Sequence, residues 1–256
     1  MQRLYPTYGP VDGIPGLIEA YRYPSALDGA YVRATMVASL DGAAWGTDRR
    51  SGSLSSPVDR EAFAVMRGLA DVILAGAKTV RAEGYGPAVT TTELAARRVA
   101  DGQRPDPVIA VVSRTLDFDA GAPLFTEATD PTVVFTIERS PVDKRDVLSE
   151  VARVIVVGDK DIDVGAALDA LADIGLPRVM CEGGPHLLGH VAAAERIDEL
   201  CLTVSPLLAG GDAPRIVDGA PPLPGAAMAL AHIIEDHGTL LTRWTRQPAP
   251  STSARS

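Results

Sequence analysis

The sequence predicts an α/β protein with a mostly parallel sheet that an antiparallel hairpin closes at the C-terminal end. From Tyr31 onward, short β-branched apolar runs alternate with stretches of helical periodicity, which is typical of strands connected by helices. After Val204 this alternation stops, and two extended segments, 229–235 and 239–244, follow each other across the short polar connector Asp236-His237-Gly238. With 256 residues and 46% hydrophobic content, the chain is long enough to bury a large core.

The apolar runs and their flanking signals predict the individual elements. Ser56-Pro57 supplies an N-cap and a first-turn proline, and apolar residues then recur at helical spacing as far as Leu69. Ser140-Pro141 repeats this start signal, and a further apolar stripe over 164–174 ends at Gly175, a residue suited to a left-handed C-terminal cap. The predicted strands of the main sheet are 32–39, 72–75, 108–113, 132–137, 154–157, 178–182 and 199–204.

We expect one domain over residues 31–246, preceded by an N-terminal extension, 1–30, and followed by a disordered tail, 247–256. The first fifteen residues are polar and rich in Pro and Gly and lack the features of a signal peptide, so we expect them to lie along the surface. The tail is rich in Pro, Ser, Thr and Ala and has no apolar pattern. No apolar run approaches the roughly 20 residues that span a bilayer, so no membrane segment is expected.

Charge and cysteine content narrow the classes of partner. The formal net charge of -9 disfavours binding to nucleic acid or to an anionic membrane, since both attract clustered Lys and Arg. Cys181 and Cys201 lie in apolar strand-like runs, which favours buried free thiols and a reducing, cytoplasmic location. The four histidines form no ligand cluster; His186 and His190 are four residues apart but have no glutamate pattern of a zinc protease, so no metal site is expected.

Three strand-to-helix junctions carry the residue types of a nucleotide site. Gly76 to Val80, Ser113-Arg114-Thr115 and Glu182 to Leu187 each follow a predicted strand, at the sheet edge where parallel α/β proteins bind ligands. Glycines allow close approach of the backbone, helix N-termini attract phosphates, and Ser113 with Arg114 suits the 2′-phosphate that distinguishes NADPH from NADH. A glycine after a strand is usually only a turn, but three junctions together favour a site. Neither the G-x-G-x-x-G fingerprint nor the P-loop pattern is present.

Two further residues have both a structural and a functional interpretation. Asp41, in Ser39-Leu40-Asp41-Gly42, is either a turn cap or a catalytic carboxylate beside the polar loop 51–57. Arg67 is either a surface cation on an otherwise apolar helix or a ligand for a substrate phosphate.

In this order, Ser-Leu-Asp-Gly at 39–42, Ser-Ser-Pro at 55–57, Gly-Ala-Lys-Thr-Val at 76–80 and Glu-Gly-Gly-Pro at 182–185 resemble the reductase domain of the bacterial bifunctional riboflavin-biosynthesis deaminase-reductase. The resemblance runs from about Tyr31 to Trp244. It implies a dihydrofolate-reductase-like, three-layer α/β/α fold, a homodimer and NADPH as cofactor. It also implies hydride transfer from nicotinamide C4 to the ribosylamino carbon of 5-amino-6-(5-phosphoribosylamino)uracil or a closely related diaminopyrimidinone, with Asp41 or Glu182 near the accompanying proton.

The resemblance also assigns residues to the site. The positions that match substrate contacts are Ser51, Arg67 and Glu182. Those that match cofactor contacts are Ala38, Ser53, Thr79, Glu83, Ser113 and the loop Gly184, Pro185, His186, Leu187 and Leu188, to which the junction argument adds Gly76, Arg114 and Gly183.

The chain departs from the family pattern at two cations. Thr35 stands where the family usually has a lysine, and Thr90 stands where a second arginine is expected, so the pocket for a substrate phosphate loses two positive charges that Arg33 or Arg67 would have to replace. No segment of the 256 residues resembles the deaminase half. These departures leave open a dihydrofolate reductase acting on a pterin, and also a non-catalytic module that binds NADPH.

Overall fold

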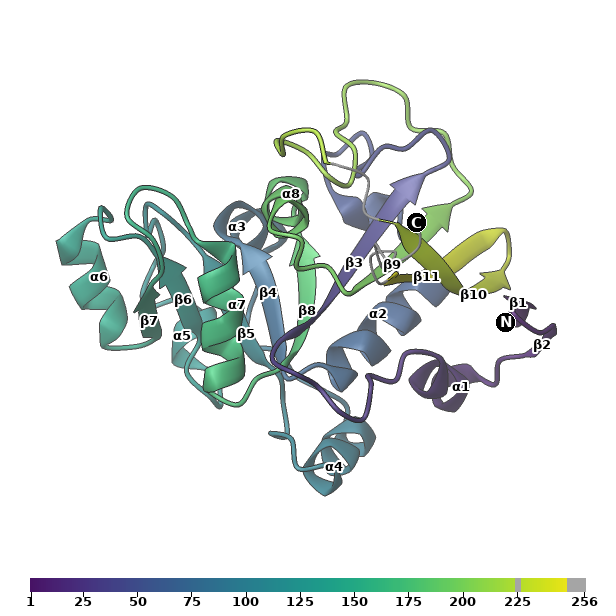
Figure 1. The fold of residues 1–256 in the computed structure, drawn as a ribbon, viewed down its shortest axis with the longest axis horizontal. Coiled ribbons are helices and arrows are strands. Elements are labelled where there is room, and N and C mark those ends of the chain that lie inside the picture. Colours follow the sequence, from purple (N-terminus) through teal and green to yellow (C-terminus); the bar gives the residue numbers. More distant parts are fainter. Residues whose placement is uncertain (224–226, 248–256) are drawn as a thin grey trace, which may run out of the picture.

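The computed structural model describes residues 1–223 and 227–247, and these residues form a single sheet covered by helices on both faces (Figure 1). The expected disordered tail lies outside the described residues except for Gln247. The strands are β1 (Gln2–Tyr5), β2 (Gly9–Pro10), β3 (Tyr31–Ser39), β4 (Val72–Gly76), β5 (Val108–Val112), β6 (Val133–Thr136), β7 (Arg153–Val156), β8 (Arg178–Gly183), β9 (Glu199–Ser205), β10 (Met228–Asp236) and β11 (Thr239–Arg246). The helices are α1 (Gly13–Ala20), α2 (Pro57–Leu69), α3 (Ala77–Glu83), α4 (Thr92–Ala100), α5 (Pro123–Thr126), α6 (Val142–Ser149), α7 (Val164–Asp173) and α8 (Pro185–Ala193).

The strand order is β2-β1-β10-β11-β9-β3-β8-β4-β5-β6-β7. From β9 through β3, β8, β4, β5 and β6 to β7 every pair is parallel, whereas β11, β10, β1 and β2 add antiparallel pairs beyond β9. All nine strands predicted from the sequence are present, and the mostly parallel sheet with a closing antiparallel hairpin is confirmed. The parallel strands β3, β4 and β8 therefore present their carboxyl ends at one edge, where a ligand site is expected.

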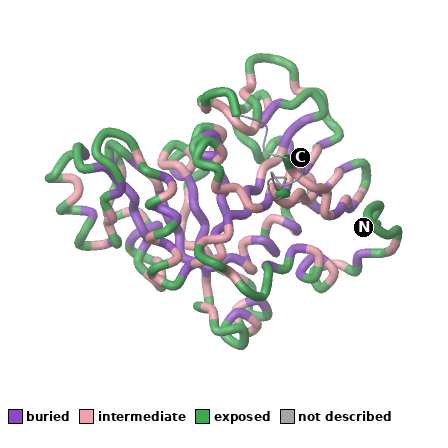
Figure 2. The backbone as a smooth tube through the Cα atoms, in the orientation of Figure 1, coloured by how far each residue is buried: buried purple, intermediate pink, exposed green. Residues whose placement is uncertain are grey.

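Helices on both faces make the fold three-layered, as the resemblance implies. α7 and α8 pack with Val32, Leu74, Val179 and Cys181 on one face. The opposite face is covered by α1, α2 and α4 around Met180 and Cys201, and by α3, α5 and α6 around Ile73 and Val134. The sheet is consequently buried through the middle of the molecule (Figure 2). Cys181 and Cys201 are buried and free, as predicted.

Local signals in the sequence account for the elements that shape the site. The side chain of Ser56 caps α2 by accepting a hydrogen bond from the Asp59 backbone N–H, and Pro57 takes the first helical position, where its missing N–H costs nothing. In the closing hairpin, His237 and Gly238 have φ values of 46° and 83°. Positive φ at both central residues is the geometry of the tight turn that matches strand twist, and glycine adopts it without strain.

The N-terminal residues contribute more secondary structure than the sequence indicated. β1 pairs antiparallel with β10, and α1 buries Leu17 and Ile18 beside α2. The four residues of β1 are all exposed, so no apolar alternation marked it as a strand. No helix in residues 1–223 and 227–247 combines the length and apolar character that crossing a membrane requires.

A buried ion network lies under this N-terminal segment. Arg33 on β3 donates to Glu199 on β9 at 2.5 Å, and Arg243 on β11 donates to the other carboxylate oxygen at 2.7 Å. The side chains of Arg33 and Glu199 have no exposed surface. The aromatic ring of Tyr23 covers Arg33, with the guanidinium carbon 4.0 Å from the ring centroid. Burial opposes ionisation of Glu199, but the two guanidinium groups outweigh it and lower the pKa of Glu199 to about 2.

Candidate active site

A cavity of about 670 Å³ lies at the carboxyl ends of β3, β4 and β8. Its walls come from α2, α3, the start of α8 and two loops, one around Trp45 and Ser51 and the other from Asp212 to Asp218. This volume lies within the range of small-molecule and cofactor sites, and its place at the carboxyl ends of parallel strands is where such sites form.

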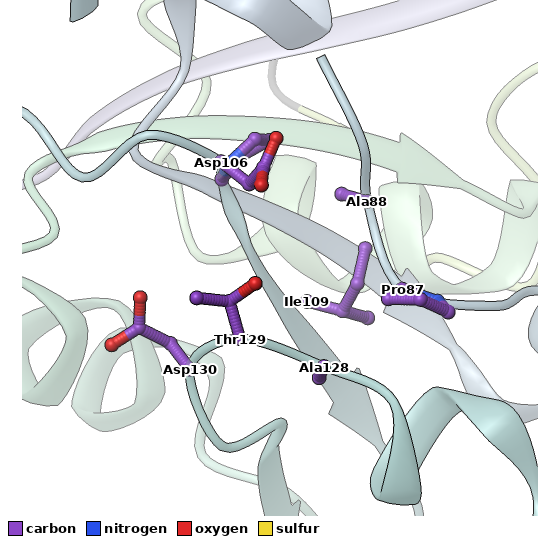
Figure 3. Close-up of a pocket in the computed structure, with 8 residues that line it drawn as sticks. Pro87, Ala88, Asp106, Ile109, Ala128, Thr129 and Asp130 are labelled. Carbon is purple, nitrogen blue, oxygen red and sulfur yellow. The ribbon is translucent and has the colours of Figure 1, made fainter. Parts of the chain in front are cut away.

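A second hollow, between the segments around Pro87, Asp106 and Thr129, has about 10 Å³ of space (Figure 3). That space holds about one water molecule. The larger cavity is therefore the candidate active site. No group of three His, Cys, Asp or Glu side chains within the described ranges is arranged to hold a metal ion.

Arg67, Glu182 and Tyr85 form a hydrogen-bonded cluster in the cavity wall. Arg67, in the last turn of α2, donates from Nε to Oε1 of Glu182 at 2.6 Å and from Nη2 to Oε2 at 2.7 Å. Tyr85, just after α3, donates its hydroxyl to Oε2 of the same carboxylate. The guanidinium of Arg67 also lies against the rings of Phe63 and Tyr85. Arg67 and Glu182, predicted separately as substrate contacts, are thus joined to each other by two hydrogen bonds.

Burial and charge set the protonation of this cluster. Burial tends to lower the pKa of Arg67, but its hydrogen bonds and charge interaction with Glu182 raise that pKa overall. Burial, with the neighbouring Glu182 charge, raises the pKa of Tyr85, so its hydroxyl stays protonated and donates. The Glu182 side chain is 2% exposed and accepts three hydrogen bonds.

Next to this cluster, the cavity wall is built from glycines and a helix start. The backbone N–H of Gly184 donates to Oγ1 of Thr79 at 2.7 Å, and a Cβ at Gly184 would lie 3.0 Å from that oxygen. A side chain at position 184 would therefore crowd the Thr79 hydroxyl where the β8 turn approaches α3. Gly184 is the N-cap of α8, so the first backbone N–H groups of that helix lie beside the cavity.

Most predicted site residues line this cavity. They are Ser51, Arg67, Gly76, Thr79, Glu83, Glu182, Gly184, Pro185, His186 and Leu187. The remaining predicted residues do not line it: Ala38, Asp41, Ser53, Ser113, Arg114, Gly183 and Leu188.

Asp41 is engaged in holding two loops together. Its carboxylate accepts hydrogen bonds from the Ser39 hydroxyl at 2.5 Å and from the backbone N–H groups of Ala209 at 3.0 Å and Gly210 at 2.7 Å. The Ser39 hydroxyl, followed by these amides, lowers the pKa of Asp41 well below its usual range. An anion held in this way favours the structural interpretation of Asp41, and its role as a proton donor stays a prediction.

Ser113 and Arg114 lie at the end of β5, outside the cavity wall. The Ser113 hydroxyl accepts a hydrogen bond from the Leu116 backbone N–H, and Arg114 pairs with the carboxylate of Asp161 at 2.7 Å. Both Arg114 and Asp161 are exposed. Their role in binding a 2′-phosphate stays a prediction, since Arg114 would have to leave Asp161 or bind the phosphate beside it.

The positive charge around the cavity comes from basic side chains other than those at the two positions where the family usually has cations. Thr35 lines it, whereas Thr90 is bonded to Asp106 outside it, and Arg33 is held on Glu199 away from the wall. Cations that the sequence reasoning did not single out do line the cavity: Arg49, Arg60 and Lys78. Also missed were Asp59, Trp45 and Tyr85. The Asp59 position, two residues after a helix-starting proline, has the ordinary sequence appearance of a first-turn acid.

Comparisons with known proteins show the family to which this chain belongs. The family model described as RibD C-terminal domain matches residues 30–241. A 2,5-diamino-6-ribosylamino-4(3H)-pyrimidinone 5′-phosphate reductase of Archaeoglobus fulgidus is 30% identical over 190 residues, which is 74% of this chain and 86% of that protein. A reductase of the same name from Aquifex aeolicus is 32% identical over 66% of this chain and 73% of its own length.

A solved pyrimidine reductase-like protein from Corynebacterium diphtheriae superposes with a TM-score of 0.78 at 24% identity, covering 86% of this chain and 93% of that one. A riboflavin biosynthesis reductase from yeast superposes with a TM-score of 0.66 at 14% identity, over 91% of this chain and 99% of its own. At these identities the superpositions show a shared fold.

Proposed function

Because the chain belongs to the RibD C-terminal domain family, we propose that it is an NADPH-dependent reductase of the riboflavin-pathway type. The proposed substrate is a ribosylamino pyrimidine phosphate. One candidate is 2,5-diamino-6-ribosylamino-4(3H)-pyrimidinone 5′-phosphate, which appears in the names of the relatives, and the other is 5-amino-6-(5-phosphoribosylamino)uracil. The observation that carries the proposal is that one cavity combines the Arg67–Glu182 unit with the Thr79–Gly184 turn and the start of α8.

The residues of the cavity fit a nicotinamide dinucleotide. Gly76 and Gly184 carry no side chain where the backbone borders the cavity, and the first N–H groups of α8 suit a phosphate. Thr79, His186 and Leu187 would complete the contacts. When bound, the nicotinamide supplies the hydride that reduces the substrate.

The chain's own contribution is positioning and handling of a proton. Arg67, braced by Phe63 and Tyr85, fixes the direction of the Glu182 carboxylate, which lies in the cavity wall. We assign to Glu182 the orientation of the ribosylamino group and the holding of the proton that accompanies reduction. Trp45 and Phe63 supply apolar wall that excludes water.

Arg49, Arg60 and Lys78 are the cavity-lining cations that would attract the phosphate groups of substrate and cofactor in place of those absent at Thr35 and Thr90. Neutral residues at those two positions left open a pterin substrate without a phosphate. The cations found elsewhere in the wall provide the positive charge that a phosphorylated pyrimidine requires.

The deciding experiment follows NADPH oxidation by its absorbance, with the two pyrimidine phosphates and dihydrofolate offered separately to the same preparation. Reduction of a pyrimidine phosphate and no reaction with dihydrofolate is the expected result. Turnover of dihydrofolate alone would replace the proposal with a pterin reductase. Tight NADPH binding without oxidation by any of the three compounds would indicate a non-catalytic module that binds NADPH.

We further propose a homodimer that works in the cytoplasm. Leu200, Leu202 and Val204 lie on one face of β9, opposite buried Cys201, and remain half-buried in the single chain. An apolar strand face of this kind supports pairing with a second copy. Light scattering of the purified protein tests the dimer, and a monomer at micromolar concentration would contradict it.

A further inference from the structure

Asp59 is a buried carboxylate in the cavity wall that the proposed chemistry does not yet use. It is the third residue of α2, and only 8% of its surface is exposed. Its neighbours in the wall include Arg60 and Phe63 on the same helix and Thr35 on β3. A carboxylate is rarely buried in this way without a partner, because its desolvation is costly.

The partners of Asp59 within the structure are hydroxyl groups. Thr203 on β9 donates to Oδ1 at 2.6 Å, and Ser55 donates to Oδ2. Among the described residues, no nitrogen of Lys, Arg or His lies within 4.0 Å of this carboxylate. The two hydroxyls fix its orientation, and each oxygen keeps the capacity to accept a further hydrogen bond.

Comparison with the other buried carboxylate of the wall sharpens the point. Glu182 is neutralised by the two hydrogen bonds of Arg67 and also accepts from Tyr85. Asp59 has two oriented oxygens and no neutralising cation. The ligand group that complements this carboxylate best is therefore a pair of adjacent N–H groups, because each N–H can donate to one of the two oxygens.

The two candidate pyrimidines differ in this respect. A 2-amino-4(3H)-pyrimidinone presents the ring N3–H and an N–H of the 2-amino group side by side, which is a paired donor edge. In the 2-oxo ring, a carbonyl replaces the amino group and sets its lone pairs against those of a carboxylate. A site with a polar group built for a donor discriminates strongly against a ligand that lacks it.

From this we infer that Asp59 binds the N3–H and 2-amino edge of the pyrimidine and makes the enzyme selective for the 2-amino substrate. The inference rests on the proposed reduction of a ribosylamino pyrimidine phosphate and names the residue that chooses between its two forms.

The test compares kcat/KM for the 2-amino and 2-oxo ribosylamino phosphates, which differ at C2, using the full chain with saturating NADPH. The wild type should prefer the 2-amino compound by at least about 10-fold, the effect of a charge-assisted hydrogen-bond pair. Asp59→Asn keeps the shape and the hydroxyl neighbours but places an amide donor against the ring. It should lower kcat/KM for the 2-amino compound roughly 10- to 100-fold and change the 2-oxo value less than about threefold.

Two further variants control for folding and for charge. Glu61→Gln removes a carboxylate from the same helix outside the cavity wall and should leave both values unchanged. Asp59→Glu keeps the charge on a longer side chain and should retain the preference for the 2-amino compound at lower kcat/KM. A wild type that favours the 2-oxo compound, or an Asp59→Asn variant that slows both substrates equally, would overturn the inference.

A failure of the proposed reductase activity can be distinguished from a failure of the inference about Asp59. If the wild type reduces neither compound, the proposed function fails, and calorimetric binding of the same two compounds then tests Asp59 alone. Tighter binding of the 2-amino compound that Asp59→Asn abolishes would support the inference. Equal binding of the two compounds would refute it.

Discussion

The guanidinium of Arg67 and the carboxylate of Glu182 meet through two parallel hydrogen bonds of 2.6 and 2.7 Å, joining the last turn of α2 to the carboxyl end of β8 across 115 residues of sequence. The Glu182 side chain is 2% exposed and that of Arg67 is 29% exposed. This bidentate contact fixes both groups more firmly than either helix or strand would alone.

Glu182→Gln should therefore lower kcat much more than it weakens cofactor binding. The amide keeps the side-chain shape but loses the charge that holds Arg67 and the capacity to hold a proton, and general acid–base groups typically contribute roughly 100-fold or more to a rate. Stopped-flow kinetics would give kcat, and fluorescence titration would give the Kd for NADPH. Unchanged turnover would leave Glu182 with a structural role only.

Tyr85→Phe removes one hydroxyl and keeps the ring against Arg67. Because the Tyr85 hydroxyl donates to Glu182, its loss should shift the orientation of that carboxylate and reduce kcat by roughly 3- to 10-fold, the effect of one hydrogen bond. The thermal unfolding midpoint should change little. Phe63→Leu, which removes the other ring against Arg67, provides a comparison in which packing is lost and the hydrogen bond remains.

Arg114→Ala should weaken the binding of NADPH more than that of NADH. We expect a modest factor, about 3- to 10-fold, since Arg114 is exposed and already paired with Asp161. Asp161→Ala frees Arg114 and should not weaken NADPH. Equal losses for both cofactors in the Arg114 variant would move the 2′-phosphate contact to another cation, with Lys78 in the cavity wall as the next to test.

His232 should make the free energy of unfolding depend on pH. Burial, followed by the charge of Arg243, lowers the pKa of His232 from 6.5 to about 4. The unfolded chain therefore binds a proton before the folded chain does, so stability is fully present above pH 6.5 and falls as the pH drops toward 4, by up to about 3 kcal/mol. Urea unfolding at a series of pH values measures this. His232→Gln should flatten the decline in that window by about one proton.

Glu199→Gln should destabilise the fold strongly at neutral pH. Removing this charge leaves Arg33 buried without a counterion, and breaking one side of a buried pair typically costs about 3 to 5 kcal/mol. In the wild type, the lowered pKa of Glu199 means that this stability is present above pH 4.5 and is lost as the pH falls toward 2. Chemical denaturation at pH 7 provides the measurement, and a change below about 1 kcal/mol would contradict the expectation.

Much of the fold was predictable because it depends on local patterns. The strand over 72–75 is a continuous apolar run, the strand over 178–182 has the apolar centre Val179-Met180-Cys181, and Ser56-Pro57 is a helix start that the structure confirms. The N-terminal strand β1 was not predictable, because its residues are exposed and its pairing with β10 joins segments more than 200 residues apart. Local sequence carries no information about such pairing.

The residues of the site also fall into those that local sequence predicts and those that depend on contacts between distant segments. Glu182 and Gly184 follow directly from a strand end, and the cavity contains them. Tyr85 and Asp59 could not be found from spacing, because their importance comes from Glu182 and Thr203, which lie 97 and 144 residues away. For Arg33 the sequence suggested a role that the structure does not support. It was a candidate to bind the substrate phosphate, but its side chain is buried and paired with Glu199.

Glu182, near the end of β8, and Gly184, the N-cap of α8, are separated by one residue, so the proposed substrate contact and the proposed cofactor contact share a single stretch of backbone. Asp59 belongs to α2, which is a different element. Attempts to engineer the enzyme toward new heterocycles should therefore randomise the first turn of α2 while leaving the end of β8 and the start of α8 untouched. Libraries built on β8 would be expected to lose cofactor affinity along with the original substrate.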